Sequence, residues 1–207
     1  GAIEAVATNA GPPVTDDRNM KIAITTLAAN AFAYAAGTHR LATFTVPAGE
    51  TAISINNIAG TAGDMTTLST WYEAVPTPGT VTLGADNDLN SARDWAVVAV
   101  SIRPAGSAGQ ALRQTETVTA SITGGASITL PAWSPVANDL ILVAVALRDE
   151  TRPVSVSGNG LTFVEIANLD NAQNQTGVNL FRAMGASPTS GSITVTLGAG
   201  NTLPVVV

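Results

Sequence analysis

The chain has 207 residues, of which 45% are hydrophobic, 4% aromatic and 12% charged, and its formal net charge is −6. The negative charge and the single lysine, Lys21, exclude nucleic acid as a partner, because such binding depends mainly on neutralising phosphates. The absence of cysteine excludes disulfides and thiolate metal sites.

The longest apolar run is Leu140–Leu147, less than half of what a membrane-spanning helix needs, so we predict no membrane span. The sequence begins at Gly1, without an initiator methionine or a basic and apolar leader, which predicts a processed product or a fragment.

Strand signals recur throughout the chain between Gly, Pro, Asn and Asp residues, and no stretch sustains a capped helical period. We therefore predict an all-β protein of two tandem antiparallel β-sandwich domains. The strands predicted in the first half are Ile3–Ala7, Lys21–Thr25, Ala31–Ala36, Leu41–Val46, Thr51–Asn56, Thr66–Ala74, Gly79–Leu83 and Asp94–Arg103. Those predicted in the second half are Glu116–Thr123, Ala126–Leu130, Asp139–Leu147, Val154–Val156, Leu161–Asn168, Gly177–Met184, Ser192–Leu197 and Leu203–Val207.

Two kinds of strand can be distinguished by their apolar pattern. Ile53 and Ile55, like the apolar residues of Ile193–Leu197, alternate with Ser or Thr, which predicts outer strands with one face in water. Trp95–Ile102 and Leu140–Leu147 are apolar on both faces. This pattern predicts central strands whose second face is covered by a neighbouring domain or by loops.

An internal repeat supports the division into two domains. Thr80–Ala85 reads T-V-T-L-G-A, and Thr194–Ala199 reads the same, 114 residues further along. Two other pairs match, Asn30–Arg40 with Asn138–Arg148 at an offset of 108, and Tyr72–Ala74 with Phe181–Ala183 at an offset of 109. A duplication that has drifted in its loops explains these offsets.

The domain boundaries follow from the repeat and from a small-residue segment. We predict a first domain over 1–104, a linker over 105–112 and a second domain over 113–207, because Pro104–Gln110 is rich in Gly, Ala and Ser. The strand Trp95–Ile102 that closes the first domain has no full counterpart, since an offset of 114 carries Trp95 past Val207. The last strand of the second domain is therefore expected to be short or missing.

The motifs resemble a loose family of repeated β-sandwich modules, immunoglobulin-like or jelly-roll-like, of phage virion proteins and of bacterial surface or secreted proteins. The segments that carry the resemblance are Pro76–Leu83, Asp94–Pro104, Asn138–Arg148 and Pro188–Leu197. It implies a non-enzymatic structural or adhesive module without a cofactor, on a virion (tail, fibre or capsid decoration) or outside the cell at its surface. Its partners would be other structural subunits, in a homo-oligomer or a larger assembly.

No catalytic constellation is apparent. His39 is the only histidine, so a Ser-His-Asp mechanism would depend on it, but the chain has no G-x-S-x-G motif. We predict a surface or turn histidine and no catalysis.

Asp86, Asp88 and Asn90 place oxygens at alternate positions, as the first half of a calcium loop does. The sixth position is Ser91 and the twelfth is Val97, where the motif needs glycine and glutamate. An acidic turn is the favoured interpretation, with calcium as a weak alternative.

Trp133 lies between Pro131 and Pro135 on a stiff segment. A ring held out from such a segment could stack on a sugar, which would make the chain a carbohydrate-binding module with glycans as partners. The other interpretation is a ring that plugs the open end of the sandwich.

The short C-terminal end predicts an unpaired sheet edge, at which a neighbour could supply a strand and build a filament. The accepting residues would be Leu203, Val205, Val206 and Val207, and the donor would be the N-terminal segment with Ile3 and Val6. The alternative is that the chain is simply cut here.

Overall fold

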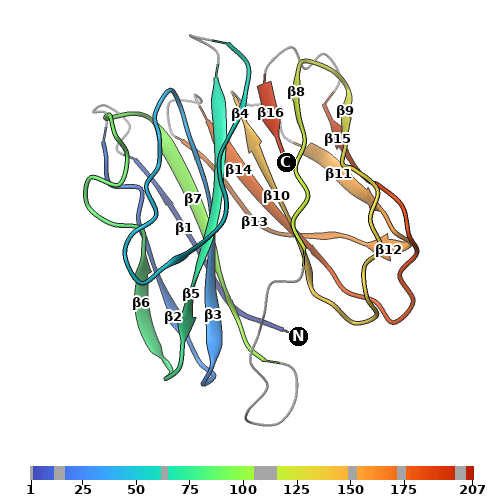
Figure 1. Ribbon diagram of the computed structural model, residues 1–207, viewed down its shortest axis with the longest axis horizontal. Helices are drawn as coiled ribbons and strands as arrows, with labels where there is room; N and C mark the ends of the chain where they lie inside the picture. The colour runs from blue at the N-terminus through green and yellow to red at the C-terminus, as the bar shows by residue number, and fades with distance from the viewer. Residues whose placement is uncertain are drawn as a thin grey trace.

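The computed structural model describes residues 2–11, 17–61, 65–104, 116–148, 153–171, 176–198 and 204–207. These residues form strands, turns and loops and contain no helix, so none of them forms a helix that could cross a membrane (Figure 1). The all-β class predicted from the sequence is therefore confirmed. The predicted linker over 105–112 lies outside the described residues.

The first half of the chain forms one large and one small antiparallel sheet. The large sheet, here the N-sheet, has the strand order β1-β7-β3-β5-β4, and the N-cover is the pair β2-β6. The strands are β1 (Ile3–Ala10), β2 (Ile22–Thr26), β3 (Ala31–His39), β4 (Thr51–Ala59), β5 (Thr66–Val75), β6 (Gly79–Leu83) and β7 (Trp95–Ile102).

The second half forms the C-sheet, of order β13-β14-β10-β16-β8, and the C-cover, of order β12-β11-β15-β9. The strands are β8 (Ser121–Thr123), β9 (Ser127–Thr129), β10 (Ile141–Leu147), β11 (Pro153–Gly158), β12 (Leu161–Thr162), β13 (Val164–Asp170), β14 (Gly177–Ala183), β15 (Ile193–Leu197) and β16 (Pro204–Val206).

The two large sheets share one strand order. Reading β8, β16, β10, β14 and β13 against β1, β7, β3, β5 and β4 gives the same neighbours, and the cover pair β9-β15 corresponds to β2-β6.

The residue pairing within the large sheets changes one of the matches of the internal repeat by one residue. Ala35 pairs with Trp71, and its counterpart Val143 pairs with Phe181. Trp71 therefore corresponds to Phe181 at an offset of 110, and the offset of 109 matched residues on opposite faces.

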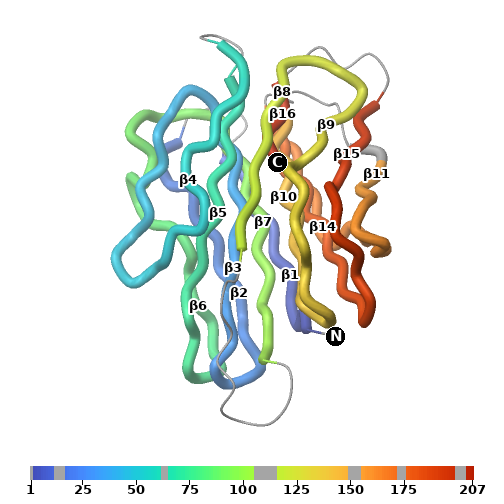
Figure 2. The backbone as a smooth tube through the Cα atoms, turned by 45° about the vertical axis from the view of Figure 1, so that its right-hand side comes forward, coloured from blue at the N-terminus to red at the C-terminus, as the bar shows by residue number. Residues whose placement is uncertain are grey.

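The sheets stack with three apolar cores between successive layers, and the strands of both halves run roughly from top to bottom in Figure 2. The N-core lies between the N-cover and the N-sheet, and includes Ile22, Ile24 and Trp71. The C-core lies between the C-sheet and the C-cover, and includes Val143 and Val195.

The middle core joins the two large sheets face to face. Val98 and Val100 of β7 lie in one cluster with Ala144 of β10 and with Val178 and Leu180 of β14. The second apolar face of each central strand is therefore covered by the sheet of the other half, as the sequence predicted.

Buried polar groups also cross this interface at one end. The hydroxyl oxygen of Thr38 lies 2.8 Å from that of Thr176 across the interface, and 3.2 Å from that of Thr66 within the N-sheet. The side-chain amide of Asn171 donates to the carbonyl oxygen of Trp95 at 3.3 Å. These bonds satisfy groups that would otherwise be buried without partners.

One predicted strand is wrong. Leu41–Val46 forms only an isolated bridge at Phe44, because a side chain takes the place of a strand partner. The amide group of Asn56 accepts from Phe44 N at 2.9 Å and donates to Phe44 O at 3.1 Å.

Two further expectations fail through irregularities. Ile53 and Ile55 do not share a face, because β4 shifts register on either side of Ser54, so Ile53 packs against the middle core and Ile55 against the N-core. The predicted strand Leu161–Asn168 is divided between β12 in the C-cover and β13 in the C-sheet.

Leu180→Ala should lower the free energy of unfolding by about 2–5 kcal/mol, because Leu180 is 0% exposed in the middle core. The same truncation at Leu27, which is 67% exposed, should change it by less than about 0.5 kcal/mol. Denaturant unfolding followed by circular dichroism measures both. Two well-separated transitions, or equal effects of the two variants, would contradict a core shared by the halves.

Candidate binding groove

The large sheets differ at one strand position, next to the central strand. In the N-sheet, β7 pairs with β3 from Phe32 to His39 and is buried along its whole length. In the C-sheet, the equivalent β16 pairs with β10 only at Ala146 and Leu147. The edge of β10 from Ile141 to Val145 has no ladder partner on this side among the described residues.

The opposite wall of this open position is formed by residues 116–120. A strand was predicted over Glu116–Thr123, but only Ser121–Thr123 is one, because β16 offers three residues to pair with. Val207 extends the contact by exchanging backbone hydrogen bonds with Ala120, at 2.9 and 3.0 Å. Beyond the Ala120–Val207 pair, no described residue of β16 lies between residues 116–119 and β10.

A groove of about 590 Å³ begins beside Val207 and lies between these walls; we call it the strand groove. Besides these two walls, the groove has two faces, which come from different halves of the molecule. One face is formed by N-sheet residues, including Tyr34 and Leu68, and the other by C-core residues, including Leu130 and Ile193. The C-terminus and β8 lie side by side in Figures 1 and 2.

The ladder alternation indicates which backbone groups face the groove. Successive residues of an antiparallel strand direct their N–H and C=O groups to opposite neighbours. Since Ala146 pairs with Val206 across this edge, Leu142 and Ala144 also direct their backbone groups to it. On the other wall, the backbone groups of Ala120 are directed to Val207.

Tyr34 is the buried ionisable group among the groove residues. Burial raises the pKa of its phenol well above the usual value, so the hydroxyl stays neutral. The charged residues that line the groove are Arg103, Glu116 and Asp139. The lining of the groove is therefore mainly apolar.

Trp133 lines the groove and is half-buried against the C-core. Its backbone exchanges two hydrogen bonds of 3.0 Å with Gly191, which fixes the segment to the end of β15. This arrangement is nearer to the predicted plug than to a ring held out for sugar stacking.

The residues predicted for assembly take different places. Val205, Val206 and Val207 are buried within the C-sheet, so the open edge lies beyond them, and Leu203 lies outside the described residues. Ile3 and Val6 pair with Ile102 and Val100 of their own chain.

The strand that contains Ile3 and Val6 is also anchored within its own chain by Glu4. The carboxylate of Glu4 accepts from the backbone N–H groups of Leu27 and Ala28, at 3.2 and 3.3 Å, and from the Ser101 hydroxyl at 3.2 Å. The structure therefore corrects the expectation of a free N-terminal donor segment.

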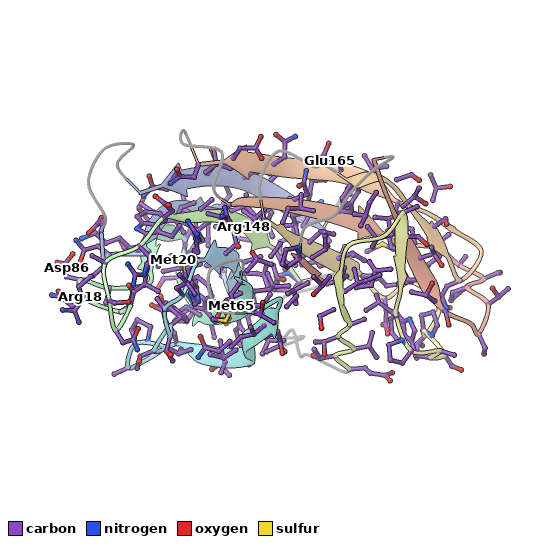
Figure 3. The ribbon with its side chains drawn as sticks, turned by 90° about the horizontal axis from the view of Figure 1, so that it is seen from above. Arg18, Met20, Met65, Asp86, Arg148 and Glu165 are labelled. Atoms are coloured by element: carbon purple, nitrogen blue, oxygen red, sulfur yellow. The ribbon has the colours of Figure 1, made fainter. Side chains whose placement is uncertain are left out.

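The oxygens of the weak calcium candidate are used within the fold. Asp88 accepts from the N–H groups of Met20 and Ala85, at 2.8 and 3.1 Å, and Asn90 accepts from Thr43 N at 2.8 Å. Asp86 pairs with Lys21 and lies at the outer end of the N-terminal half in Figure 3. In the part of the chain that the structure describes, no three His, Asp or Glu residues are grouped to hold a metal ion.

The prediction of a surface position for His39 is wrong. His39 is 0% exposed at the end of β3, where it pairs with Thr67 and Trp95 in the middle of the N-sheet. Burial lowers the pKa of His39 to about 4, so the ring is neutral at pH 7.

Comparison of the chain with protein-family models, with curated proteins and with solved structures gave no match. The strand groove is therefore interpreted from its own geometry.

His39 should make the protein less stable in acid. Its pKa is about 4 when folded and about 6.5 when unfolded, so the unfolded chain binds the proton more readily. The contribution of the neutral His39 ring to the free energy of unfolding is complete above pH 6.5. It is lost as the pH falls to about 4, which lowers the free energy of unfolding by about 3 kcal/mol. His39→Leu should remove this dependence in urea titrations at pH 4, 5.5 and 7. Parallel profiles of variant and parent would contradict the assignment.

No sequence motif points to Glu50, yet it should change the pH dependence of stability in the opposite direction to His39. Burial raises its pKa to about 7, although Gly84 N donates to its carboxylate at 3.0 Å. The folded state then holds the proton more tightly, so this contribution to stability declines as the pH rises from 4.5 to 7. Glu50→Gln should abolish the decline while leaving the His39 profile in place. A decline that persists in this variant would assign it to another group.

Proposed function

We propose that the protein is a non-enzymatic structural or interaction component of an assembly, on a virion or outside the cell at its surface. The observation that carries this proposal is the pair of matching five-stranded sheets, which share one strand order and pack face to face through the middle core.

The same proposal interprets the two halves as tandem β-sandwich modules that arose by duplication, over 1–104 and 113–207. Their shared strand order and the repeated T-V-T-L-G-A segments support this interpretation. Modules arranged in tandem are typical of proteins that span or decorate a surface, and this is also what the sequence resemblance implies.

The packing between the halves suits a mechanical role. The middle core is apolar, and the hydroxyl contact between Thr38 and Thr176 crosses it at one end. A large hydrophobic interface holds two modules in one orientation, whereas a small polar one permits relative motion. A rigid double module can present its surface in a fixed direction on a virion tail, fibre or capsid, or on a cell surface.

Immunogold electron microscopy of the producing culture tests this proposal. Antibodies against the chain should label virions or the cell surface, and chemical cross-linking of intact particles should join the chain to structural subunits. Antibody pre-absorbed with the purified protein is the matched control. Recovery of the chain only as an isolated monomer, without label on any particle or surface, would refute the proposed role.

A further inference from the structure

We infer that one end of the N-core holds bound water, in a site formed by the side chains of Trp95, His39 and Thr67. These three residues, here the polar row, belong to β7, β3 and β5. His39 pairs with Trp95 on one side and with Thr67 on the other. None of the three lines the strand groove, and the site does not depend on the proposed role in an assembly.

The polar row faces the N-core. Paired residues of neighbouring antiparallel strands direct their side chains to the same face of a sheet, and Trp95 packs in the N-core. His39 and Thr67 are 0% exposed, and Trp95 is 2% exposed. Each polar atom of the row therefore depends on partners inside the molecule.

The protein itself supplies no hydrogen-bond partner to four polar atoms of the row. Nε1 of Trp95, both ring nitrogens of His39 and Oγ1 of Thr67 are buried, and no described side chain or backbone group bonds to any of them. Buried polar groups that lack a protein partner are satisfied by internal water, because leaving them unpaired is costly. Four such atoms on three adjacent residues indicate one shared site.

The chemistry of these atoms favours water over an ion. The indole of Trp95 only donates, the neutral imidazole of His39 has one donor and one acceptor, and the hydroxyl of Thr67 can do both. Water also donates and accepts, so it can serve every atom of the row. An anion could not donate to the imidazole acceptor, and a metal ion could not bind the indole N–H.

The second half of the molecule shows that the fold does not require polar residues at these positions. The equivalent row is Leu147, paired with Val205 on one side and with Gly177 on the other. These side chains contain no nitrogen or oxygen, and Leu147 and Val205 belong to the C-core. The polar row is therefore an addition to the shared architecture, and binding of a polar guest accounts for it.

Two glycines allow the chain to close around the polar row. Gly11 donates its N–H to the carbonyl oxygen of Trp95 at 3.0 Å, and a Cβ at Gly11 would lie 2.9 Å from Nε1 of that ring. Gly37 precedes His39 by two residues on the same face, and a Cβ there would lie 2.8 Å from Sδ of the fully buried Met20. We therefore expect the bound water to exchange with solvent only when this end of the N-core opens.

Water-selective NOESY and ROESY spectra of the intact ¹⁵N-labelled protein at pH 7 test the inference. A cross-peak between water and the indole Hε1 proton of Trp95 should have opposite signs in the two spectra, because it arises from dipolar contact with bound water. Trp95→Phe assigns the proton by removing its signal. The double variant His39→Leu/Thr67→Val removes the other polar atoms of the row and should abolish the cross-peak.

Two further variants separate loss of water from loss of structure. Thr66→Val is the matched control, because Thr66 is also buried on β5 but bonds to Thr38 on the opposite face of the sheet, and it should leave the cross-peak in place. His39→Gln keeps a donor and an acceptor at this position and should retain the cross-peak. The dispersion of the backbone amide spectrum checks folding in every sample.

Three results would overturn the inference. The first is no water cross-peak at Trp95, or one with the same sign in both spectra, which reports proton exchange with solvent. The second is a cross-peak that persists in the double variant, and the third is an indole shift that follows replacement of chloride by acetate, which would assign the site to an anion. Each is measured on the isolated protein, so none depends on whether immunogold label is found on particles.

Discussion

Apolar contact between the two large sheets is the constraint on which the rest of this structure depends. A sheet covered on both faces needs central strands that are apolar at successive positions, and β7 and β10 satisfy this need. Several of the contact residues are alanines, including Ala36, Ala96 and Ala146, and small side chains allow the two backbones to approach closely. Each large sheet therefore covers the second face of the other.

The same covering explains why the open strand position persists as a groove. In a single-layer sheet, a missing strand would leave a gap that neighbouring strands could close by sliding together. Here β10 is held by β14 on one side and by cores above and below. Residues 116–120 are held at one end by the ladder between β8 and β16, and Val118 and Ala120 pack against the C-core. The walls therefore stay apart, although the strand between them is short.

Much of this fold could be predicted from local pattern. Most strands were found because apolar runs in this chain are separated by Gly, Pro, Asn and Asp turns. The repeat also indicated the matching order of the two halves, because the two T-V-T-L-G-A segments contribute β6 and β15, which take equivalent places in the two covers.

The features that the sequence did not predict have a different cause. Each concerns a residue whose surroundings depend on contacts between segments far apart in the chain. His39 precedes Arg40 at the end of an apolar run and looks like a surface residue, yet it lies between Thr67 and Trp95 inside the sheet. The loop at Phe44 looks like a strand because nothing local shows that the side chain of Asn56 will serve as its partner. Glu50 is half-buried through its contact with Gly84, which lies 34 positions away.

The polar contacts at one end of the middle core also fix the alignment of the two halves. Apolar contact is non-directional and would permit the two sheets to slide over one another at little cost. The bond between Thr38 and Thr176 and the bond from Asn171 to the carbonyl oxygen of Trp95 form in one alignment, and sliding would leave these buried groups unsatisfied. The apolar core therefore holds the halves together, while a few polar groups determine their register.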